Sequence, residues 1–379
     1  MVNGAWYAGS AAILTAGGSV VSECRISSRN PFPIRHSPFA IRHSPFATPT
    51  DGVRLSDAKI IRHNPPFVPT MPCPALHFYR HGFNAMGSPC EIHLYSPSRP
   101  TANAAIQAVV TDVLRLEARY SRYRPDSDLA RINAVAHQGG AIRVDDETRY
   151  LLDYADTCYR QSDGLFDITS GLLRQAWQFE SGQLPDRARV DTLLETVGWH
   201  RVRWEAPWLA FGVAGMALDL GGIVKEYAAD RAAMLCRNLG LAHGLINLGG
   251  DIRVIGTHPD GRPWRLGLQH PRQPGQLIDT VNLRHGGLAS SGDYARCMVV
   301  DGRRYGHILN PRTGWPVDGL AAVSVWAELC VVAGSASTIA MLKGREGIQW
   351  LEALGLPCYW VDVDGKRGGH GLSTDPADV

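Results

Sequence analysis

The chain has 379 residues, 45% of them hydrophobic, and its 38 basic residues nearly balance 36 acidic ones, for a formal net charge of +2 at pH 7. This composition can fill a substantial core and excludes the broad basic surface that nucleic acid or anionic lipid requires. The eight cysteines include no CxxC pair, so the strong signal of a zinc site or redox dithiol is missing. We expect a globular protein that binds a small ligand, with no nucleic-acid partner and no transmembrane segment, because no apolar run approaches roughly 18 residues.

Residues 1–75 differ in composition from the rest of the chain. They contain the tandem repeat IRHSPFA and are rich in Pro, Arg, His and Ser, a composition that cannot bury a core. We interpret this region as a disordered extension, or as translated sequence upstream of a true start at Met71. Residues 11–24 are weakly similar to a secretion signal ending at a lipidatable Cys24, but they lack a basic start. The expected location is therefore the cytoplasm, with a periplasmic or membrane-anchored lipoprotein as the alternative.

Regular elements are predicted from about residue 76 onward. Cys90, Ile92 and Leu94 alternate with other side chains, which indicates a half-buried strand. Later strands are predicted over residues 216–222, 242–250, 264–270, 279–285 and 321–327, and helices over residues 101–119, 146–164, 223–241 and 335–344. Ser127 suits the N-cap of a further helix. Because strands outnumber helices but are interleaved with them, we predict an α+β fold with a largely antiparallel sheet.

Two of these segments contain a pair of glycines. In ALDLGGIVKEYAADRAA, residues 217–233, the pair precedes a helix with Lys225 in its first turn. Free amides and the helix dipole suit an anion at such a junction, although a tight structural turn explains it equally well. In INLGGDIRVIG, residues 246–256, Asn247 and Asp251 flank the pair, which indicates either a hairpin or the close approach of a ligand.

Two further segments concentrate polar and aromatic side chains. DGLFDITSGLL, residues 163–173, places Phe166 beside Asp167, a pair that could hold a ring and its polar edge or serve as core and cap. The segment SSGDYARCMVVDGRRYGHILNPRTGWPV gathers Ser290, Ser291, Asp293 and His307 around two tight turns. A histidine in this setting is a general base, a ligand-orienting donor or a structural residue.

The segments that carry a resemblance are AMGSPCEI, SRYRPDSDLARIN, GLFDITSG, LDLGGIVKEYAAD, INLGGDIRVIG, SSGDYAR, HILNPRTGWP and AGSASTIAMLKG. In this order and spacing they resemble the FAD:protein FMN transferase (ApbE) family over about residues 80–365. Members of that family move FMN from FAD to a Ser or Thr of a target flavoprotein. The resemblance implies one catalytic domain over residues 76–370, made of α+β halves around a flavin cleft.

The resemblance also implies roles for individual residues. His307 would be the base that activates the acceptor hydroxyl, and Lys225 would hold the phosphates as a point charge. The acceptor would attack the FMN-side phosphorus and release AMP with the help of Mg²⁺. The implied FAD contacts are Met86, Tyr123, Leu165, Phe166, Asp167, Asp219, Lys225, Ser291, Gly292 and Ile308.

The chain departs from the family pattern at the metal site. Family members carry an Asp at the position of Gly334 and a Thr at that of Thr338, which bind magnesium together with a backbone carbonyl near Gly222. Here only Gly222 and Thr338 remain, and Glu226 replaces a common Gly, so that it either supplies a ligand or points to solvent. The alternatives to a transferase are an FAD-binding protein of the same fold without transfer chemistry and a pyrophosphatase that cleaves FAD to FMN and AMP.

Overall fold

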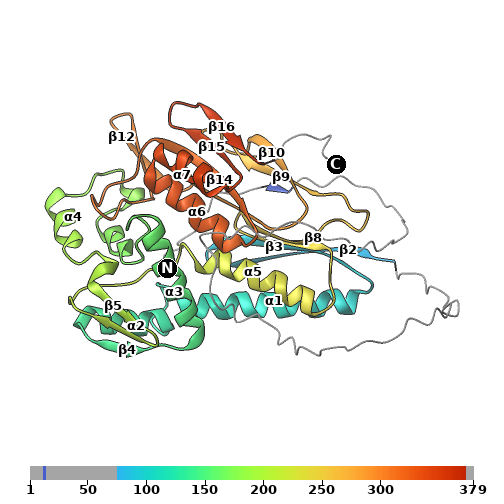
Figure 1. Ribbon diagram of the computed structural model, residues 1–379, viewed down its shortest axis with the longest axis horizontal. Helices are drawn as coiled ribbons and strands as arrows, with labels where there is room; N and C mark the ends of the chain where they lie inside the picture. The colour runs from blue at the N-terminus through green and yellow to red at the C-terminus, as the bar shows by residue number, and fades with distance from the viewer. Residues whose placement is uncertain (1–11, 14–74, 373–379) are drawn as a thin grey trace, which may run out of the picture.

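The computed structural model describes residues 12–13 and 75–372, so most of the predicted N-terminal extension lies outside the described residues. Its largest sheet has eight strands in the order β16-β15-β14-β11-β8-β7-β3-β2, and every neighbouring pair is antiparallel (Figure 1). These strands are β2 (His77–Ala85), β3 (Ser88–Ser96), β7 (Gly244–Leu248), β8 (Asp251–Gly256), β11 (Gly287–Gly292), β14 (Leu320–Ala327), β15 (Cys358–Asp362) and β16 (Arg367–His370).

Helices α1 (Arg99–Tyr120), α5 (Val224–Asn238) and α6 (Cys330–Lys343) cover one face of this sheet, and α7 (Glu346–Leu354) packs on α6 (Figure 1). The helices α1 and α5 are neighbours, as are α5 and α6. On α1, Ile106, Val109 and Val113 recur at helical spacing and are buried, which turns that face toward the sheet. The main core lies between the three helices and this face.

The opposite face of the sheet packs against a smaller sheet of β1 (Ala12–Ile13), β9 (Trp264–Gln269) and β10 (Leu277–Leu283) in the order β1-β9-β10. Successive side chains of a strand point to opposite faces. Ile246 therefore joins the core under the helices, whereas Leu245 joins a second core with Trp264 and Val281. The middle strands are buried on both faces as a result.

The remaining elements extend beyond this layered part, on the left of Figure 1. They are α2 (Asp128–Gln138), α3 (Asp146–Gln161), α4 (Arg187–Leu194), the 3₁₀ helices η1 (Ser170–Gln175), η2 (Phe179–Ser181) and η3 (Trp199–Arg201), the strands β4 (Ala141–Arg143), β5 (Val202–Glu205) and β6 (Trp208–Phe211), and the hairpin β12 (Cys297–Val300) and β13 (Arg303–Gly306). Strands β4, β6 and β5 form a three-stranded antiparallel sheet. In the part of the chain that the structure describes, no helix is both long and apolar enough to span a membrane.

The predicted α+β class with a largely antiparallel sheet is confirmed. The predicted N-cap is also observed, because the Ser127 hydroxyl accepts a hydrogen bond from the Ala130 amide at 2.9 Å. The double glycine at Gly249 and Gly250 is the turn of the β7–β8 hairpin, with φ angles of 62° and 100°. These positive φ angles explain the choice of glycine at both turn positions.

The strand predicted over residues 216–222 is wrong, since this segment is irregular and ends in a turn before α5. The predicted alternation of buried side chains is present, because Met216, Leu218 and Leu220 are buried. However, a side chain, and not a partner strand, forms the hydrogen bonds to the backbone of this segment at Leu218. The amide of Asn133 accepts from the Leu218 N–H at 2.7 Å and donates to the Leu218 carbonyl at 3.0 Å.

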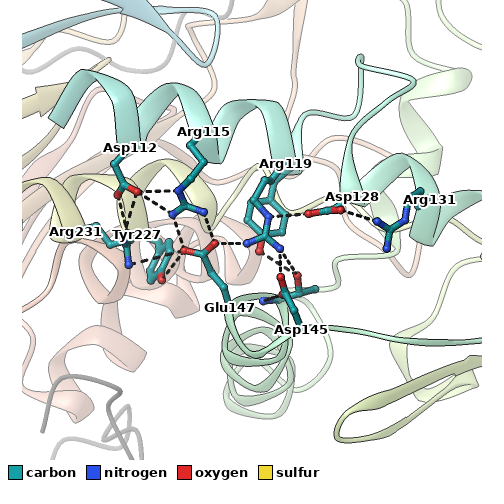
Figure 2. Close-up of polar contacts among 11 residues, drawn as sticks. Asp112, Arg115, Arg119, Asp128, Arg131, Asp145, Glu147, Tyr227 and Arg231 are labelled. Atoms are coloured by element: carbon teal, nitrogen blue, oxygen red, sulfur yellow. Dashed lines mark hydrogen bonds and ion pairs between the residues drawn. The ribbon is translucent and has the colours of Figure 1, made fainter. Parts of the chain in front are cut away.

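A network of ion pairs ties α1, α2, α3 and α5 together (Figure 2). Its centre is Glu147, whose side chain is 15% exposed. Arg115 donates to both oxygens of this carboxylate at 2.6 and 2.8 Å, Arg119 also pairs with it, and the Tyr227 hydroxyl donates at 3.3 Å. The other charged members shown are Asp112, Asp128, Arg131, Asp145 and Arg231. The network fixes α1, which reaches the candidate site with its last turn.

Candidate functional site

A cavity of about 670 Å³ opens where the layered part meets the remaining elements. Cavities of this size hold cofactors and small-molecule substrates. Every residue predicted to serve the site lines this one cavity: Met86, Tyr123, Leu165, Phe166, Asp167, Asp219, Gly222, Lys225, Ser291, Gly292, His307, Ile308 and Thr338. The fold therefore gathers residues from positions 86 to 338 around one space.

The β2–β3 hairpin supplies one wall of the cavity. Its turn consists of Met86 and Gly87, whose φ angles are 52° and 68°. A non-glycine residue with positive φ is uncommon. Here the Met86 amide donates to the Glu117 carboxylate of α1 at 2.8 Å, which holds the turn in place. Met86 thus faces the cavity in a fixed backbone conformation.

Aromatic and aliphatic side chains form a wall suited to a planar ring. Phe166 is buried, and its amide donates to the Ser162 hydroxyl at 2.7 Å. Leu165 and Ile308 pack beside the main core. Tyr123 is 61% exposed although it lines the cavity. An aromatic ring in this position can cover a bound ring system by stacking.

Asp167 lines the cavity, but its carboxylate is used within the protein. The amide and hydroxyl of Thr169 donate to one oxygen at 2.8 and 2.6 Å, and the Trp199 amide donates to the other at 2.8 Å. This arrangement agrees with the cap interpretation of Asp167. The Asp167 carboxylate therefore joins the segments that contain Thr169 and Trp199, and in this way it shapes the wall of the cavity.

Another wall carries positive charge. Arg122 donates to the Asp219 carboxylate at 2.6 Å, Arg174 lies 4.0 Å from the same carboxylate, and Arg296 also lines the cavity. Burial raises the pKa of Asp219, but the two guanidinium groups of Arg122 and Arg174 outweigh this effect and hold the pKa below its ordinary value. With more guanidinium than carboxylate groups on this side, the wall suits a phosphorylated ligand.

Lys225 and Asp251 form a buried ion pair at 2.6 Å. Lys225 lies in the first turn of α5, and Asp251 follows the Gly249–Gly250 turn at the start of β8. Although burial lowers it, Asp251 and the neighbouring Glu226 hold the pKa of Lys225 above its ordinary value. The lysine is therefore charged, and its ammonium group is held at the cavity.

Glu226 is only 7% exposed and also lines the cavity. The interpretation that this residue points to solvent is therefore wrong. Burial and the nearby Asp251 carboxylate raise the pKa of Glu226 to about 8. The cavity thus holds two buried carboxyl groups beside one lysine.

His307 follows strand β13 and faces the cavity. Its Nδ1 lies 3.2 Å from the Arg296 carbonyl oxygen. Because a carbonyl only accepts hydrogen bonds, Nδ1 carries the proton and Nε2 carries the lone pair. Burial and the nearby Arg174 lower the pKa of His307 to about 4. The ring is therefore neutral at physiological pH and can accept a proton.

The polar residues of the 290–317 segment divide into two groups. Ser290 and Ser291 line the cavity, and the Ser291 hydroxyl lies 3.0 Å from the Thr338 hydroxyl. Asp293 instead pairs with Arg272 at 2.5 and 2.8 Å and is not among the cavity-lining residues. Unlike the two serines, Asp293 therefore anchors the segment and does not line the cavity.

The family model described as ApbE matches residues 86–360. The chain belongs to the ApbE family. The FAD:protein FMN transferase of Treponema pallidum is 31% identical over 283 residues, which cover 69% of this chain and 77% of the relative. That of Chlamydia pneumoniae is 30% identical over 248 residues, covering 63% and 76%. The solved structure of the ApbE protein from Thermotoga maritima aligns with a TM-score of 0.71 and 29% identity, over 77% of this chain and 97% of that one.

The donors in this ApbE cavity suit a hard cation. In the part of the chain that the structure describes, no three His, Cys, Asp or Glu side chains cluster as metal ligands. The cavity nevertheless offers the carboxylates of Asp251 and Glu226, the Thr338 hydroxyl and the backbone at Gly222. Oxygen donors of this kind fit Mg²⁺, which is commonly bound by one or two carboxylates together with substrate phosphates.

Sequence reasoning missed the arginines of this ApbE site. Arg122 directly precedes Tyr123 in a segment already selected for its resemblance, so its position was a usable signal. Arg174 and Arg296 carry no local signal, because they reach the cavity only through the packing of η1 and of the chain before β12.

Proposed function

We propose that this chain is an FAD:protein FMN transferase that moves FMN from FAD to a Ser or Thr hydroxyl of a target flavoprotein and releases AMP. The observation that carries the proposal is that one cavity combines an aromatic wall, a cationic wall and a neutral histidine. The relatives from Treponema pallidum and Chlamydia pneumoniae bear the name of this activity.

The residues of the cavity have different proposed roles, according to their chemistry. The flavin ring would lie against Tyr123 and Phe166, and the diphosphate would face Arg122 and Lys225, whose fixed positive charges stabilise the charge that develops during transfer. His307 would take the proton of the acceptor hydroxyl as its oxygen bonds to the FMN-side phosphorus. The phosphoanhydride bond then breaks, and AMP leaves with the bonding electron pair.

The proposal includes a bound divalent cation. The backbone at Gly222 and the Thr338 hydroxyl are the proposed neutral ligands, and Asp251 lies in the same cavity. When bound, Mg²⁺ would neutralise phosphate charge and lower the barrier to phosphoryl transfer. We propose FAD as the substrate and Mg²⁺ as the metal.

The decisive experiment measures AMP released from FAD by the purified protein. It is run with Mg²⁺ or a chelator, and with or without a peptide that carries the acceptor Ser or Thr of a flavinylated protein. AMP and a covalently flavinylated peptide should form only when metal and peptide are both present. AMP without peptide would show a pyrophosphatase, and retained FAD without AMP under every condition would show a binding protein.

Tyr123 provides a test of the flavin-binding wall. Replacing Tyr123 by Ala should weaken FAD binding about fivefold, because stacking of an aromatic pair contributes about 1 kcal/mol. Titration of FAD fluorescence measures the affinity. Tyr123→Phe keeps the ring and should bind within about twofold of the wild type. Equal affinities of all three proteins would remove Tyr123 from the proposed site.

The partner follows from the same proposal. The partner is a flavoprotein whose acceptor Ser or Thr reaches the cavity, beside which the exposed Tyr123 ring lies. The cytoplasmic location expected from the sequence remains a prediction. Separation of cell fractions followed by detection of the protein would test it.

A further inference from the structure

The carboxylate of Glu226 is placed in a way that stability alone does not explain. Its side chain belongs to the first turn of α5 and is 7% exposed. Among the described residues, its Oε2 atom is buried and has no hydrogen-bond partner. Buried polar atoms are normally satisfied, because an unpartnered one loses its hydration without compensation. An oxygen of this kind at the wall of a cavity indicates a ligand that the cavity receives.

Gly334 on the neighbouring helix α6 makes room for this side chain. A Cβ atom placed on Gly334 would lie 2.5 Å from Cγ and 2.8 Å from Oε1 of Glu226. Contacts this short require one of the two groups to move. The Glu226 side chain therefore occupies the space into which any side chain at position 334 would extend. In its observed conformation, the Glu226 side chain therefore requires glycine at position 334.

The surroundings of Glu226 supply further oxygen atoms. Thr338 lies one helical turn beyond Gly334, and its hydroxyl is 3.0 Å from that of Ser291. Asp251 is held by Lys225 at 2.6 Å. These carboxylates and hydroxyls all line the same cavity. Hard oxygen donors beside a phosphate-binding space are the setting in which Mg²⁺ or Mn²⁺ binds.

We propose that Glu226 and Gly334 are a reciprocal exchange, in which the carboxylate ligand of a divalent cation comes from α5 instead of α6. Glu226 fills the position above Gly334 from the facing helix and binds the cation together with the Thr338 hydroxyl. This inference rests on the proposed transferase function, but it concerns a residue of this chain and a binding event that can be measured without turnover.

The test measures the affinity of the whole protein for Mn²⁺ alone and with FAD, by calorimetry and by the electron paramagnetic resonance of the free ion. Glu226→Gln, which keeps the side-chain volume, should weaken Mn²⁺ binding at least about tenfold. Gly334→Ala should also weaken it, because the added methyl group displaces Glu226. The double substitution Glu226→Gly and Gly334→Asp should restore the affinity to within about threefold of the wild type, a coupling expected of residues that share one site.

Glu352→Gln is the matched control, because it removes one carboxylate charge at an exposed position of α7, outside the set of cavity-lining residues. It should leave Mn²⁺ affinity within about threefold of the wild type. Unchanged Mn²⁺ affinity in Glu226→Gln would overturn the inference. So would a folded double variant that fails to recover binding, or a wild type that binds no Mn²⁺ alone or with FAD.

These outcomes are distinguishable from a failure of the proposed function. A wild type that binds Mn²⁺ through Glu226 but releases no AMP would refute the transferase and keep the metal site. Transfer activity that persists in Glu226→Gln with unchanged Mn²⁺ affinity would keep the transferase and refute the metal site.

Discussion

Replacement of His307 by Ala should lower the rate of flavin transfer about 10²- to 10⁴-fold, the usual contribution of a general base. FAD affinity should change less than about threefold. The reason lies in the ring's protonation, since Nδ1–H donates to the Arg296 carbonyl and Nε2 retains its lone pair. Single-turnover rates of AMP formation and a separate FAD titration measure the two quantities. His137→Ala, at an exposed position of α2, is the control and should leave both unchanged.

The pH dependence gives an independent check on His307. Burial and Arg174 lower its pKa to about 4, and the base is active only in its neutral form. The rate constant kcat/KM should therefore be level through pH 6.5, the ordinary value for histidine, and should fall only as the pH approaches 4. An acid limb centred near 6.5, or equal losses of rate and FAD affinity in His307→Ala, would contradict the assignment as base.

Replacement of Glu147 by Ala should lower the free energy of unfolding by about 3 kcal/mol, the cost of removing one partner from a largely buried ion-pair network. Without this carboxylate, the guanidinium groups of Arg115 and Arg119 face each other with less compensation (Figure 2). Urea unfolding followed by circular dichroism measures the change. Asp191→Ala breaks the exposed pair with Arg187 and should cost less than about 1 kcal/mol.

The same network predicts the response to acid. Although burial raises it, Arg115 and the other arginines hold the pKa of Glu147 below its ordinary value of 4.5. A carboxylate with a lowered pKa in the folded state stabilises the protein above its unfolded value and loses that contribution as the pH falls. Wild-type stability should therefore decline below about pH 4.5, and the decline should be shallower in Glu147→Ala. Parallel curves for the two proteins would show that the network does not govern acid unfolding.

Local interactions account for the features that could be predicted from the sequence. The cap at Ser127 and the turn at Gly249 and Gly250 depend on residues only a few positions apart. The start of α6 was predicted five residues late, because its cap does not come from residues nearby in the sequence. Its N-terminal amides at Cys330 and Val331 donate to Asp230 of α5 at 2.9 and 3.0 Å, so the cap comes from a distant part of the chain.

Tertiary packing accounts for what could not be predicted. In residues 216–222 buried side chains alternate with others as they do in a strand. However, the side chain of Asn133 in α2, not a neighbouring strand, forms the hydrogen bonds to the backbone of Leu218. Family resemblance located thirteen of the residues that line the cavity, because its motifs could be matched in order along the chain. The contact between Glu226 and Gly334 depends on how α5 packs against α6, and neither residue alone indicates that the other occupies its space.

The strand order of the large sheet also bears on how the protein is synthesised. The β2–β3 hairpin can form early, and α1 can cover its apolar face, but the second edge of β3 pairs with β7, where Cys90 lies opposite Leu248. During translation this edge stays open until residues 244–248 have left the ribosome. Open strand edges favour misassociation, and contacts distant in sequence slow folding. We expect the nascent β2–β3 hairpin to be the segment that chaperones bind.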